Sequence, residues 1–247
     1  MIRNIVKLKQ RHKEIKKQCD ASEDDYTAFE EKKQMLTLVS KVENSAMVIY
    51  DMYKDEFIFL HWQFDESFHF DYRKNNSEAY WELLNPNDLP FVLETEIKAY
   101  NFIKRIPSEE KKDYKLIYEC RLRDASGIHH HFLHQTIVLE LDRNRDIWLF
   151  LLLIDLIVGK ISNDPIQRMI VNLRTGKSCL FNNRSFLSQR EIEILGLISQ
   201  GLDSHEISDK LFISVNTVNN HRHNILSKTK TETTIQACYY GKRIGII

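Results

Sequence analysis

Apolar residues in the last quarter of the chain, residues 187–247, recur at the three- and four-residue spacing of amphipathic helices. The pattern predicts three helices and a fourth. The first is expected to begin at Ser188, where the S-x-x-E spacing to Glu191 favours a capping box, and to end at Gly201, which adopts a left-handed conformation easily. The positions expected to face inward are Ile192, Ile194, Leu195, Ile198, Ile207, Leu211, Val215, Val218, Ile225 and Leu226.

A short link separates the second of these helices from the third. The second is expected to begin at Asp203 or Ser204, and after Phe212 and Ile213 the hydroxyl of Ser214 is expected to cap the third. Two short helices, a tight link and a further helix describe a helix-turn-helix, in which the last helix enters the major groove of DNA.

The third helix is expected to have a polar but uncharged face, formed by Asn216, Asn219, Asn220, His223 and Ser227. Asn is a poor helix former, whereas the solvated face of a plain helical bundle usually carries Glu, Lys and Ala. An Asn amide can pair with adenine through two hydrogen bonds in the major groove. From residue 212 onward there are also five basic residues and one acidic residue, so this side is locally basic, as phosphate binding requires.

Together these residues resemble the LuxR/FixJ-type helix-turn-helix of bacterial transcriptional regulators. The pattern of that family reads roughly L-[ST]-x-R-E-x-E-[VI]-L, then G-x-[ST]-x-x-E-I-A, then I-S-x-x-T-V-x-x-H-x-x-x-I-x-x-K. The matching residues are Leu187, Ser188, Arg190, Glu191, Glu193, Ile194, Leu195, Gly201, Glu206, Ile207, Ile213, Ser214, Thr217, Val218, His221, Ile225 and Lys228. The chain departs from the pattern at Ser208, at Thr229-Lys230 and at Asn219, where the family commonly has Ala, Leu-Gly and Lys. The last departure leaves the base preference open.

The resemblance implies an all-α, four-helix domain over residues 184–247 that reads double-stranded DNA with its third helix. The residues expected to contact bases are Asn219, Asn220 and His223. The residues expected to contact phosphates or to hold the helix in place are Thr217, His221, Arg222 and Lys228. A homodimer would place two such helices about one turn of DNA apart on a near-palindromic site.

Residues 41–160 show a mixed pattern of helices and strands. Strands are expected at 47–50, 56–60, 114–123, 130–141 and 147–158, and a helix at 91–106. This order of elements, with the segment W-x-x-L-x-P-x-D-L-P from Trp81 to Pro90, resembles a PAS domain. The resemblance implies an antiparallel sheet with helices that senses a signal or mediates dimerisation. The whole chain is therefore predicted to be α+β.

Two segments flank the PAS-like domain. Residues 1–40 are expected to be helical and highly charged, packing one apolar stripe on the next domain. A dimerising helix, and a basic arm that touches DNA or a membrane, are the alternatives for this segment. Residues 161–183 are expected to be a connector with a hairpin around Arg174-Thr175-Gly176-Lys177. Aromatic residues between Trp62 and Tyr72 are a further candidate for dimer surface.

Composition argues against several other classes of protein. The formal net charge is zero, so DNA binding must depend on a local patch. The four Cys show no C-x-x-C spacing, which fits a reducing cytoplasm and no structural zinc. The longest apolar run, 147–158, contains Asp155 and is too short to span a bilayer, and residues 1–10 lack the apolar core of a signal peptide. A phosphoacceptor receiver domain is not expected, because the alternating β/α repeats of a doubly wound sheet are missing.

His129, His130, His131 and His134 form a dense cluster of titratable side chains. On a strand, His129 and His131 would face one side, and His130 and His134 the other. Two imidazoles on one face can bind a metal or sense protons, but no Cys or acidic motif completes a site. The preferred interpretation is a solvated strand end. His61 and His69 are the candidates for axial haem ligands, yet a lone His is more often a surface or core residue, so neither a cofactor nor a metal is predicted.

We therefore predict a cytoplasmic, non-enzymatic transcriptional regulator that binds DNA through its C-terminal helices. Its expected partners are double-stranded DNA, a second copy of the chain, an unidentified small molecule in the PAS-like domain, and RNA polymerase. Two alternatives stay open at this stage. One is a promoter reader similar to a sigma factor, and the other is a metal- or ligand-binding sensor or enzyme built on the PAS-like domain.

Overall fold

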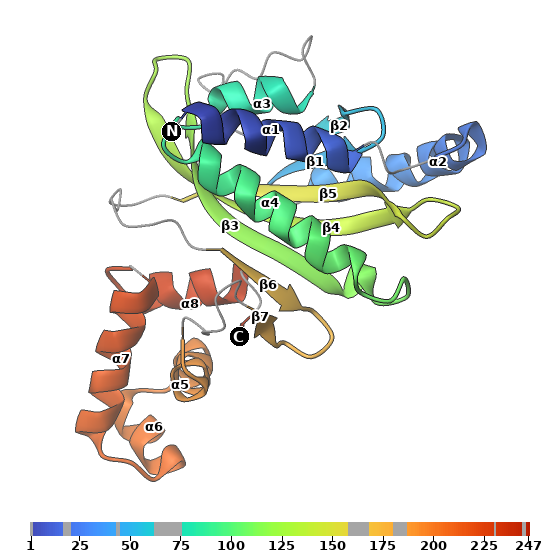
Figure 1. The fold of residues 1–247 in the computed structure, drawn as a ribbon. Helices are drawn as coiled ribbons and strands as arrows, with labels where there is room; N and C mark the ends of the chain where they lie inside the picture. Colours follow the sequence, from blue (N-terminus) through green and yellow to red (C-terminus); the bar gives the residue numbers. More distant parts are fainter. Residues whose placement is uncertain are drawn as a thin grey trace. The chain divides into compact units, whose positions relative to one another are not determined.

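The structure is a computed structural model of the chain (Figure 1). It describes residues 2–16, 21–42, 45–61, 76–157, 168–179, 187–229, 231–243 and 246–247. The chain forms two compact units, Met1–Ile170 and Val171–Ile247. The aromatic residues expected to supply dimer surface, from Trp62 to Tyr72, lie outside the described residues, as do His69 and parts of the predicted connector.

The strands follow the predicted order, and the ends of the five predicted ones differ by at most two residues from expectation. They are β1 (Ala46–Asp51), β2 (Glu56–His61), β3 (Tyr114–Arg123), β4 (His129–Leu141), β5 (Ile147–Leu156), β6 (Arg168–Asn172) and β7 (Ser178–Cys179). They are arranged in the order β2-β1-β5-β4-β3-β6-β7. The pairs β1–β2, β1–β5, β4–β5 and β3–β4 are antiparallel. The antiparallel sheet with helices expected for a PAS-like domain is therefore confirmed, and the apolar run in β5 is a central strand, as predicted.

Four tight turns of the chain are stabilised in the same way: an Asp or Asn side chain takes the place of a backbone hydrogen-bond acceptor. A side-chain oxygen accepts hydrogen bonds from the backbone N–H groups two or more residues later. The four residues are Asp51, Asp124, Asp142 and Asn172. Each turn also contains one residue with positive φ, and these residues are Asp55, Gly127, Arg145 and Gly176. The polar residues between the strands thus fix the turns, while the apolar residues fix the strands.

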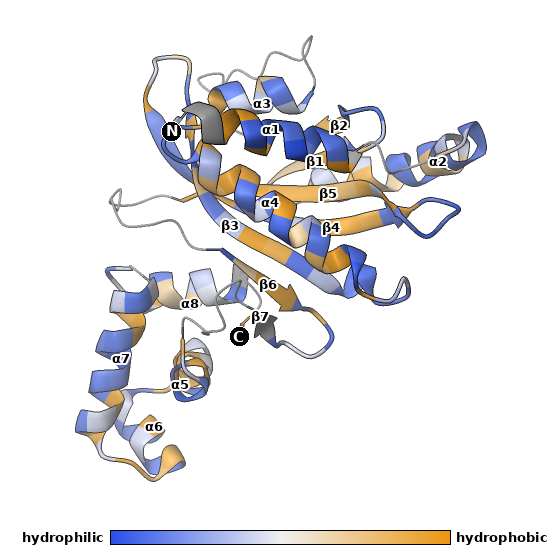
Figure 2. Ribbon diagram, in the orientation of Figure 1, coloured by the Kyte–Doolittle hydropathy of each residue, from blue (hydrophilic) through white to orange (hydrophobic). Residues whose placement is uncertain are grey.

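Three helices lie on one face of the sheet: α1 (Ile2–Lys16), α3 (Ser77–Leu83) and α4 (Leu89–Lys104) (Figure 1). Alternate strand residues face them, because successive side chains of a strand point to opposite sides. Tyr50 and Val138, for example, pack with Tyr100 and Ile103 of α4. Figure 2 shows the hydrophobic residues concentrated along the strands. The helix predicted at 91–106 begins two residues earlier, with Pro90 in its first turn, where its missing N–H costs nothing.

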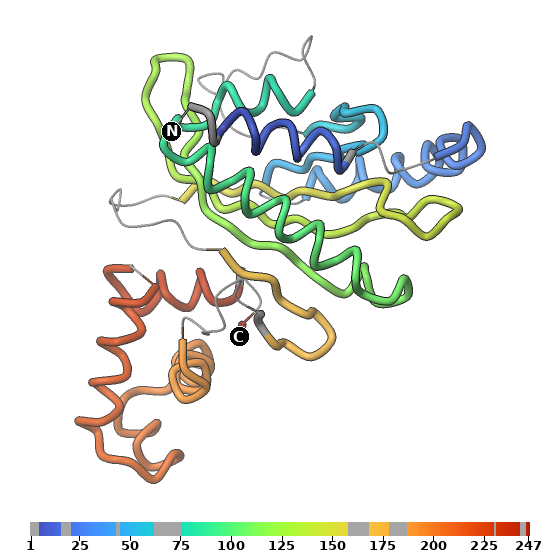
Figure 3. Tube along the Cα trace, viewed as in Figure 1, coloured from blue at the N-terminus to red at the C-terminus, as the bar shows by residue number. Residues whose placement is uncertain are grey.

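The opposite face of the sheet contacts α2 (Glu23–Ser40), which begins with a capping box formed by Ser22 and Asp25. Phe29 of α2 packs against Ile49 and Trp148. The described part of the segment 1–40 is therefore largely helical, as predicted, and its two helices, α1 and α2, lie on different faces of the sheet. α1 packs along α4, which Figure 3 shows in the Cα trace. A 3₁₀ turn, η2 (Lys111–Asp113), precedes β3.

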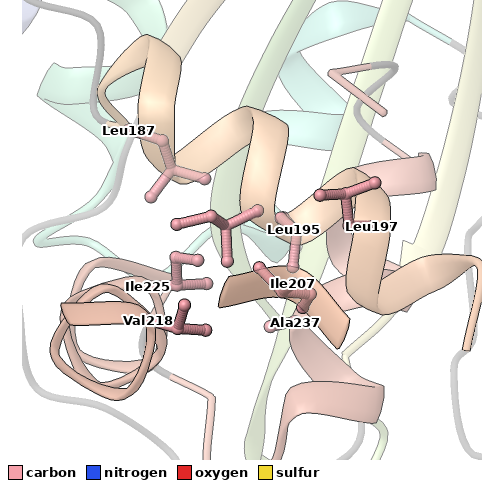
Figure 4. Packing of buried hydrophobic residues seen from close by; sticks show 8 residues of the cluster. Leu187, Leu195, Leu197, Ile207, Val218, Ile225 and Ala237 are labelled. Atoms are coloured by element: carbon pink, nitrogen blue, oxygen red, sulfur yellow. The ribbon is translucent and has the colours of Figure 1, made fainter. Parts of the chain in front are cut away.

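The second unit holds α5 (Gln189–Ser199), α6 (Ser204–Leu211), α7 (Val215–Thr229) and α8 (Thr234–Arg243). Their apolar faces meet in one core, which includes Leu187, Leu195, Ile207, Val218 and Ile225 (Figure 4). The predicted inward positions are confirmed at Ile194, Leu195, Ile207, Val218 and Ile225, while Ile192, Ile198, Leu211 and Leu226 are partly buried against the same core. Val215 is half-buried at the start of α7. A first unit of mixed helices and strands and a second unit built mainly of the helices α5 to α8 make the fold α+β.

Candidate nucleic-acid interface

Each of the helices α5, α6 and α7 begins at a side-chain cap. Ser188 and Glu191 form the predicted capping box of α5, and Asp203, rather than Ser204, caps α6 in a second capping box with Glu206. The Ser214 hydroxyl accepts a hydrogen bond of 3.1 Å from the backbone N–H of Thr217 at the start of α7. Gly201, in the turn between α5 and α6, has a φ of +94°, as predicted. Such caps fix where each helix starts, and therefore which residues share a face.

An ion pair between a buried carboxylate and an exposed Lys joins the beginning of α5 to the end of α7. The Lys228 Nζ lies 2.8 Å from Glu191 Oε1 and 2.7 Å from Oε2, and the Glu191 side chain is only 3% exposed. Burial raises the pKa of Glu191, but the hydrogen bonds from Lys228 and Ser188 outweigh burial and lower it below its usual range. Lys228 therefore holds α7 against α5 in this structure, one of the two roles expected for it.

The turn between α6 and α7 is held by Arg190 and contains a strained residue. The Arg190 Nη2 donates to the carbonyl of Leu211 at 3.0 Å, at the end of α6. Phe212 follows with a φ of +53°, in the left-handed region that favours Gly. Its side chain is 94% exposed, so no packing compensates for the strain. This turn sets the angle between α6 and α7.

The polar face predicted for α7 is exposed along its whole length. Asn216, Asn219, Asn220, His223 and Ser227 are all exposed to solvent. Val218 and Ile225, on the opposite side of the helix, are fully buried. Because the core fixes the buried side, the amide and imidazole groups are held outward, where base edges could reach them.

Asn219 and Asn220 differ in their surroundings although they are neighbours in sequence. The Oδ1 of Asn219 accepts a 2.9 Å hydrogen bond from the hydroxyl of Ser204, the first residue of α6. A bidentate contact with adenine uses both the oxygen and the nitrogen of the amide. Asn219 must therefore share or release the Ser204 hydroxyl to read a base. No hydrogen bond of this kind holds the Asn220 side chain within the described part of the chain.

Three residues predicted to position the helix are half-buried on α7: Thr217, His221 and Arg222. The Thr217 hydroxyl lies 2.8 Å from that of Ser214, within the cap of the helix. Hydrogen bonds from the backbone of Glu206 and His205, and then the positive charge of Arg222, lower the pKa of Asp203 below its usual range. Arg222 is thus close enough to the N-terminus of α6 to affect its capping carboxylate. Within the described residues, the Nδ1 of His221 is buried without a hydrogen-bond partner.

α8 closes the core on one side and is exposed on the other. Ala237 is fully buried, whereas Ile235 and Tyr239, four residues apart and so on one face, are 81% and 61% exposed. A pair of large apolar side chains left in solvent at this spacing is typical of a surface that another protein covers.

Residues 185–240 match the family model described as bacterial regulatory proteins, luxR family. The matched segment contains all of the capping residues, the turn and the polar face described above. The C-terminal segment is a LuxR-type helix-turn-helix domain. The family resemblance predicted from the sequence is thereby confirmed for this part of the chain.

The relatives match over the same domain. The transcriptional regulatory protein LnrK of Bacillus subtilis is 43% identical over 60 residues, which are 24% of this chain and 27% of that protein. The transcriptional regulatory protein LiaR of Bacillus subtilis is 46% identical over 61 residues, 25% of this chain and 29% of that protein. The oxygen regulatory protein NreC of Staphylococcus carnosus is 40% identical over 69 residues, 27% of this chain and 32% of that protein. The chain thus spans less than a third of the length of these curated relatives.

Two solved structures align over longer stretches at low similarity. A Vibrio cholerae VqmA dimer, described as a LuxR-type receptor, aligns over 86% of this chain and 88% of its own, with 13% identity and a TM-score of 0.34. A PAS domain of a protein from Colwellia psychrerythraea aligns over 50% of this chain and 95% of its own, with 13% identity and a TM-score of 0.38. These TM-scores are too low to support any argument about the first unit. Its description depends on the order of its strands and helices given above.

The sequence pattern did not assign roles to two residues of the LuxR-type domain. Arg190 stands in the family pattern, but its contact with the Leu211 carbonyl joins residues 21 positions apart. Ser204 bonds Asn219 across 15 positions. The only sequence signal for either contact was the fixed R-E spacing after Ser188. It marks Arg190 as part of the family pattern but does not indicate which residue Arg190 contacts.

The histidine cluster of β4 is not the solvated strand end that the sequence favoured. His134 is fully buried, stacked on Tyr118 at 5.0 Å, with its Nε2 3.0 Å from the Tyr80 hydroxyl. That interpretation is therefore wrong for His134, because it pairs with Ile154 of the central strand β5, far from the turn. His130 does lie beside the turn, with its Nε2 2.8 Å from Asp124 Oδ2.

The described residues contain no group of three or more His, Cys, Asp or Glu side chains placed to hold a metal ion. Among the same residues, no helix is both long and apolar enough to cross a membrane.

Proposed function

We propose that the chain is a DNA-binding transcriptional regulator whose α7 enters the major groove. The observation that carries this proposal is the exposed, uncharged polar face of α7, held outward by the buried core of a LuxR-type domain. In this position Asn219, Asn220 and His223 contact bases. Thr217, His221, Arg222 and Lys228 contact phosphates or hold the helix at the right depth. Residues 184–247 carry this activity.

The regulator acts without catalysis, in the cytoplasm, and affects RNA polymerase at the promoters it occupies. Support for a non-enzymatic role comes from the relatives, which are named as regulatory proteins. The four Cys without C-x-x-C spacing support a reducing compartment.

A homodimer fits two apolar surfaces left exposed in the chain. One is the pair Ile235 and Tyr239 on α8. The other is a stripe on the second half of α2 that continues just beyond its end: Met35, Leu38 and Val39 are exposed on the helix, and Val42 is exposed in the turn after it. Charge placed on either surface should weaken the dimer because the charge would be buried without a partner. Light scattering of Leu38→Glu and Ile235→Glu, with Thr37→Glu on another face of α2 as control, tests this. A dimer unchanged in both variants would exclude both surfaces.

The first unit serves as the sensory part, with a cavity as the place for a small molecule. The cavity has a volume of about 120 Å³ and is lined by residues of the sheet and of the helices α1, α3 and α4. This is of the same order as the ~150 Å³ engineered cavity that binds benzene. A ligand seated there would be in contact with both the sheet and the helices that cover it.

Selection from a random duplex library, followed by fluorescence anisotropy, tests the DNA-binding function. We expect the full chain to enrich a near-palindromic site and to bind it more tightly than a scrambled duplex. The affinity should fall steeply with salt, because Lys and Arg release counterions from phosphates. Binding without any enrichment of sequence would contradict base reading by α7.

A further inference from the structure

The cavity of the first unit has an apolar wall and one polar end. Aromatic rings form much of the wall, among them Tyr50, Phe57, Tyr80, Trp81 and Tyr100. The carboxylate and the imidazole of the lining, Glu96 of α4 and His12 of α1, lie next to each other and form the polar end. Within the described residues, no Lys or Arg lines the cavity. The electrostatic character of the site is therefore set by a carboxylate inside an aromatic wall.

The Glu96 carboxylate is held in place from two directions. Its Oε1 accepts a 2.9 Å hydrogen bond from the hydroxyl of Tyr118 on β3, and its Oε2 lies 2.8 Å from His12 Nε2. The negative charge of Glu96 also affects Tyr118. Burial, and then this charge, raise the pKa of the Tyr118 hydroxyl well above its usual value. A carboxylate fixed in this way is a preorganised acceptor for a donor or a cation.

His12 adds a second acceptor. A carboxylate without its proton can only accept, so the Nε2 of His12 carries the proton that it shares with Glu96. In the tautomer whose one proton is on Nε2, the Nδ1 is an acceptor. Within the described part of the chain this Nδ1 is buried and has no hydrogen-bond partner. A buried polar atom left unsatisfied destabilises the structure, so such an atom beside a cavity points to a missing donor.

Resting on the sensory role proposed above, we infer that the cavity binds a small amphiphilic amine. Its apolar body would occupy the aromatic wall, and its N–H groups would donate to Glu96 and to the Nδ1 of His12. Aromatic faces also attract a cationic nitrogen, which adds to the pairing with the carboxylate. An anionic ligand is disfavoured, because it would be buried beside a carboxylate with no cation to offset the repulsion. The head group would compete with His12 for Glu96, and so α1 would respond to occupancy.

Three probes that share one ring and differ only in charge test the inference: benzylamine, benzyl alcohol and benzoate. Titration calorimetry on the full chain at pH 7 should show benzylamine binding at least about tenfold more tightly than benzoate, as expected for one charge-assisted hydrogen bond. Glu96→Gln should reduce the preference for the amine over the alcohol to about twofold or less. The matched control is Glu94→Gln on the same helix, whose side chain pairs with Lys98 and does not line the cavity.

A fourth variant locates the binding site. Ala99→Leu adds methyl groups to the cavity wall and should abolish binding of all three probes. Binding that survives this change takes place elsewhere and overturns the inference. Benzoate binding as tightly as benzylamine, or an amine preference that survives Glu96→Gln, contradicts the amine class while leaving a sensory cavity in place. Failure of all three probes contradicts the sensory role itself, whereas DNA binding is measured separately and is unaffected by either result.

Discussion

The two units of the chain treat their polar side chains in opposite ways. In the first unit, His134, Tyr80 and Tyr118 are buried: the Tyr80 hydroxyl lies within hydrogen-bond distance of His134, and the Tyr118 ring stacks on His134 while its hydroxyl donates to Glu96. In the second, the amide and imidazole groups of α7 are exposed. Polar side chains therefore have different roles in the two units: inside the first unit they help to specify a core, and on the surface of the second they are available to a partner. Whether a polar side chain is buried or exposed indicates, better than its residue type, where each unit binds its ligand.

The largest effect expected to test this contrast between buried and exposed polar groups is the pH dependence of stability that His134 causes. Burial lowers its pKa to about 4 from the usual 6.5, so the unfolded chain takes up a proton before the folded unit does as the pH falls. The neutral His134 therefore contributes stability above pH 6.5 that is lost between pH 6.5 and about 4, amounting to about 3 kcal/mol. Urea unfolding followed by Trp fluorescence across this range measures it.

His134→Phe should remove this part of the pH dependence, and His130→Phe, near the turn, should keep it. Equal pH slopes in the wild type and in His134→Phe would show that the imidazole is not held neutral by the core.

The next effect concerns Glu191, a buried carboxylate of α5 that pairs with Lys228 of α7. Lys228→Ala should destabilise this unit by about 2–3 kcal/mol, because it leaves Glu191 buried without its cation. Thermal unfolding measured by circular dichroism checks this value, with Lys242→Ala on α8 as an exposed control. Recovery of stability when Glu191→Gln is combined with Lys228→Met would confirm that the loss came from the unpaired charge.

Lys228 also carries the separate prediction of a phosphate contact. If it makes one on DNA, Lys228→Ala should weaken binding about equally on all sequences and reduce the salt slope by about one. A stability loss with an unchanged salt slope would limit Lys228 to holding α7.

Base reading should distinguish the two neighbouring Asn residues. Asn220→Ala should cost about 1–3 kcal/mol at a preferred site and relax base preference, if its amide pairs with adenine. Asn219→Ala should cost less, because its Oδ1 already accepts from Ser204. Anisotropy titrations against specific and scrambled duplexes measure both. Val218→Ala is the control, since it should lower the melting temperature through the core without changing base preference.

The smallest effect expected is a gain in stability at the turn between α6 and α7. Phe212→Gly should raise the stability of the second unit by about 0.5–1 kcal/mol, because Gly adopts the left-handed conformation without strain. Phe212→Ala removes the same exposed ring but keeps the strain, so it should give no gain. A lower melting temperature in the Gly variant would mean that the exposed ring stabilises the turn.

The sequence predicted the helices and strands well where the apolar pattern and the turn or capping residues indicate the same boundaries. The β3–β4–β5 meander follows from long apolar runs separated by Asp-led turns, and the second unit follows from a motif with fixed spacing. Both signals are local, since each residue reports on neighbours within a few positions. The exposed face of α7 was predictable for the same reason.

The sequence could not reveal contacts that bring distant segments together. The cavity's polar end joins His12 to Glu96 across 84 positions, and no periodicity links two such residues. His134 was misjudged because its neighbours in sequence are other His residues near a turn, whereas its neighbours in space are two Tyr rings. The assignment of α1 and α2 to opposite faces of the sheet also depends on packing, not on composition.

The position of β1 in the sheet has a consequence for how the first unit folds. β3, β4 and β5 pair with their neighbours in sequence, but β1 pairs with β5 across more than a hundred residues, as in Ala46 opposite Ile154. Closing so long a loop is entropically costly and tends to be slow. We expect the meander to gain amide protection first in pulsed hydrogen exchange and β1 to gain it last. Until β1 pairs with β5, one edge of β5 stays open to intermolecular pairing. Aggregation during refolding should therefore depend on how fast β1 docks.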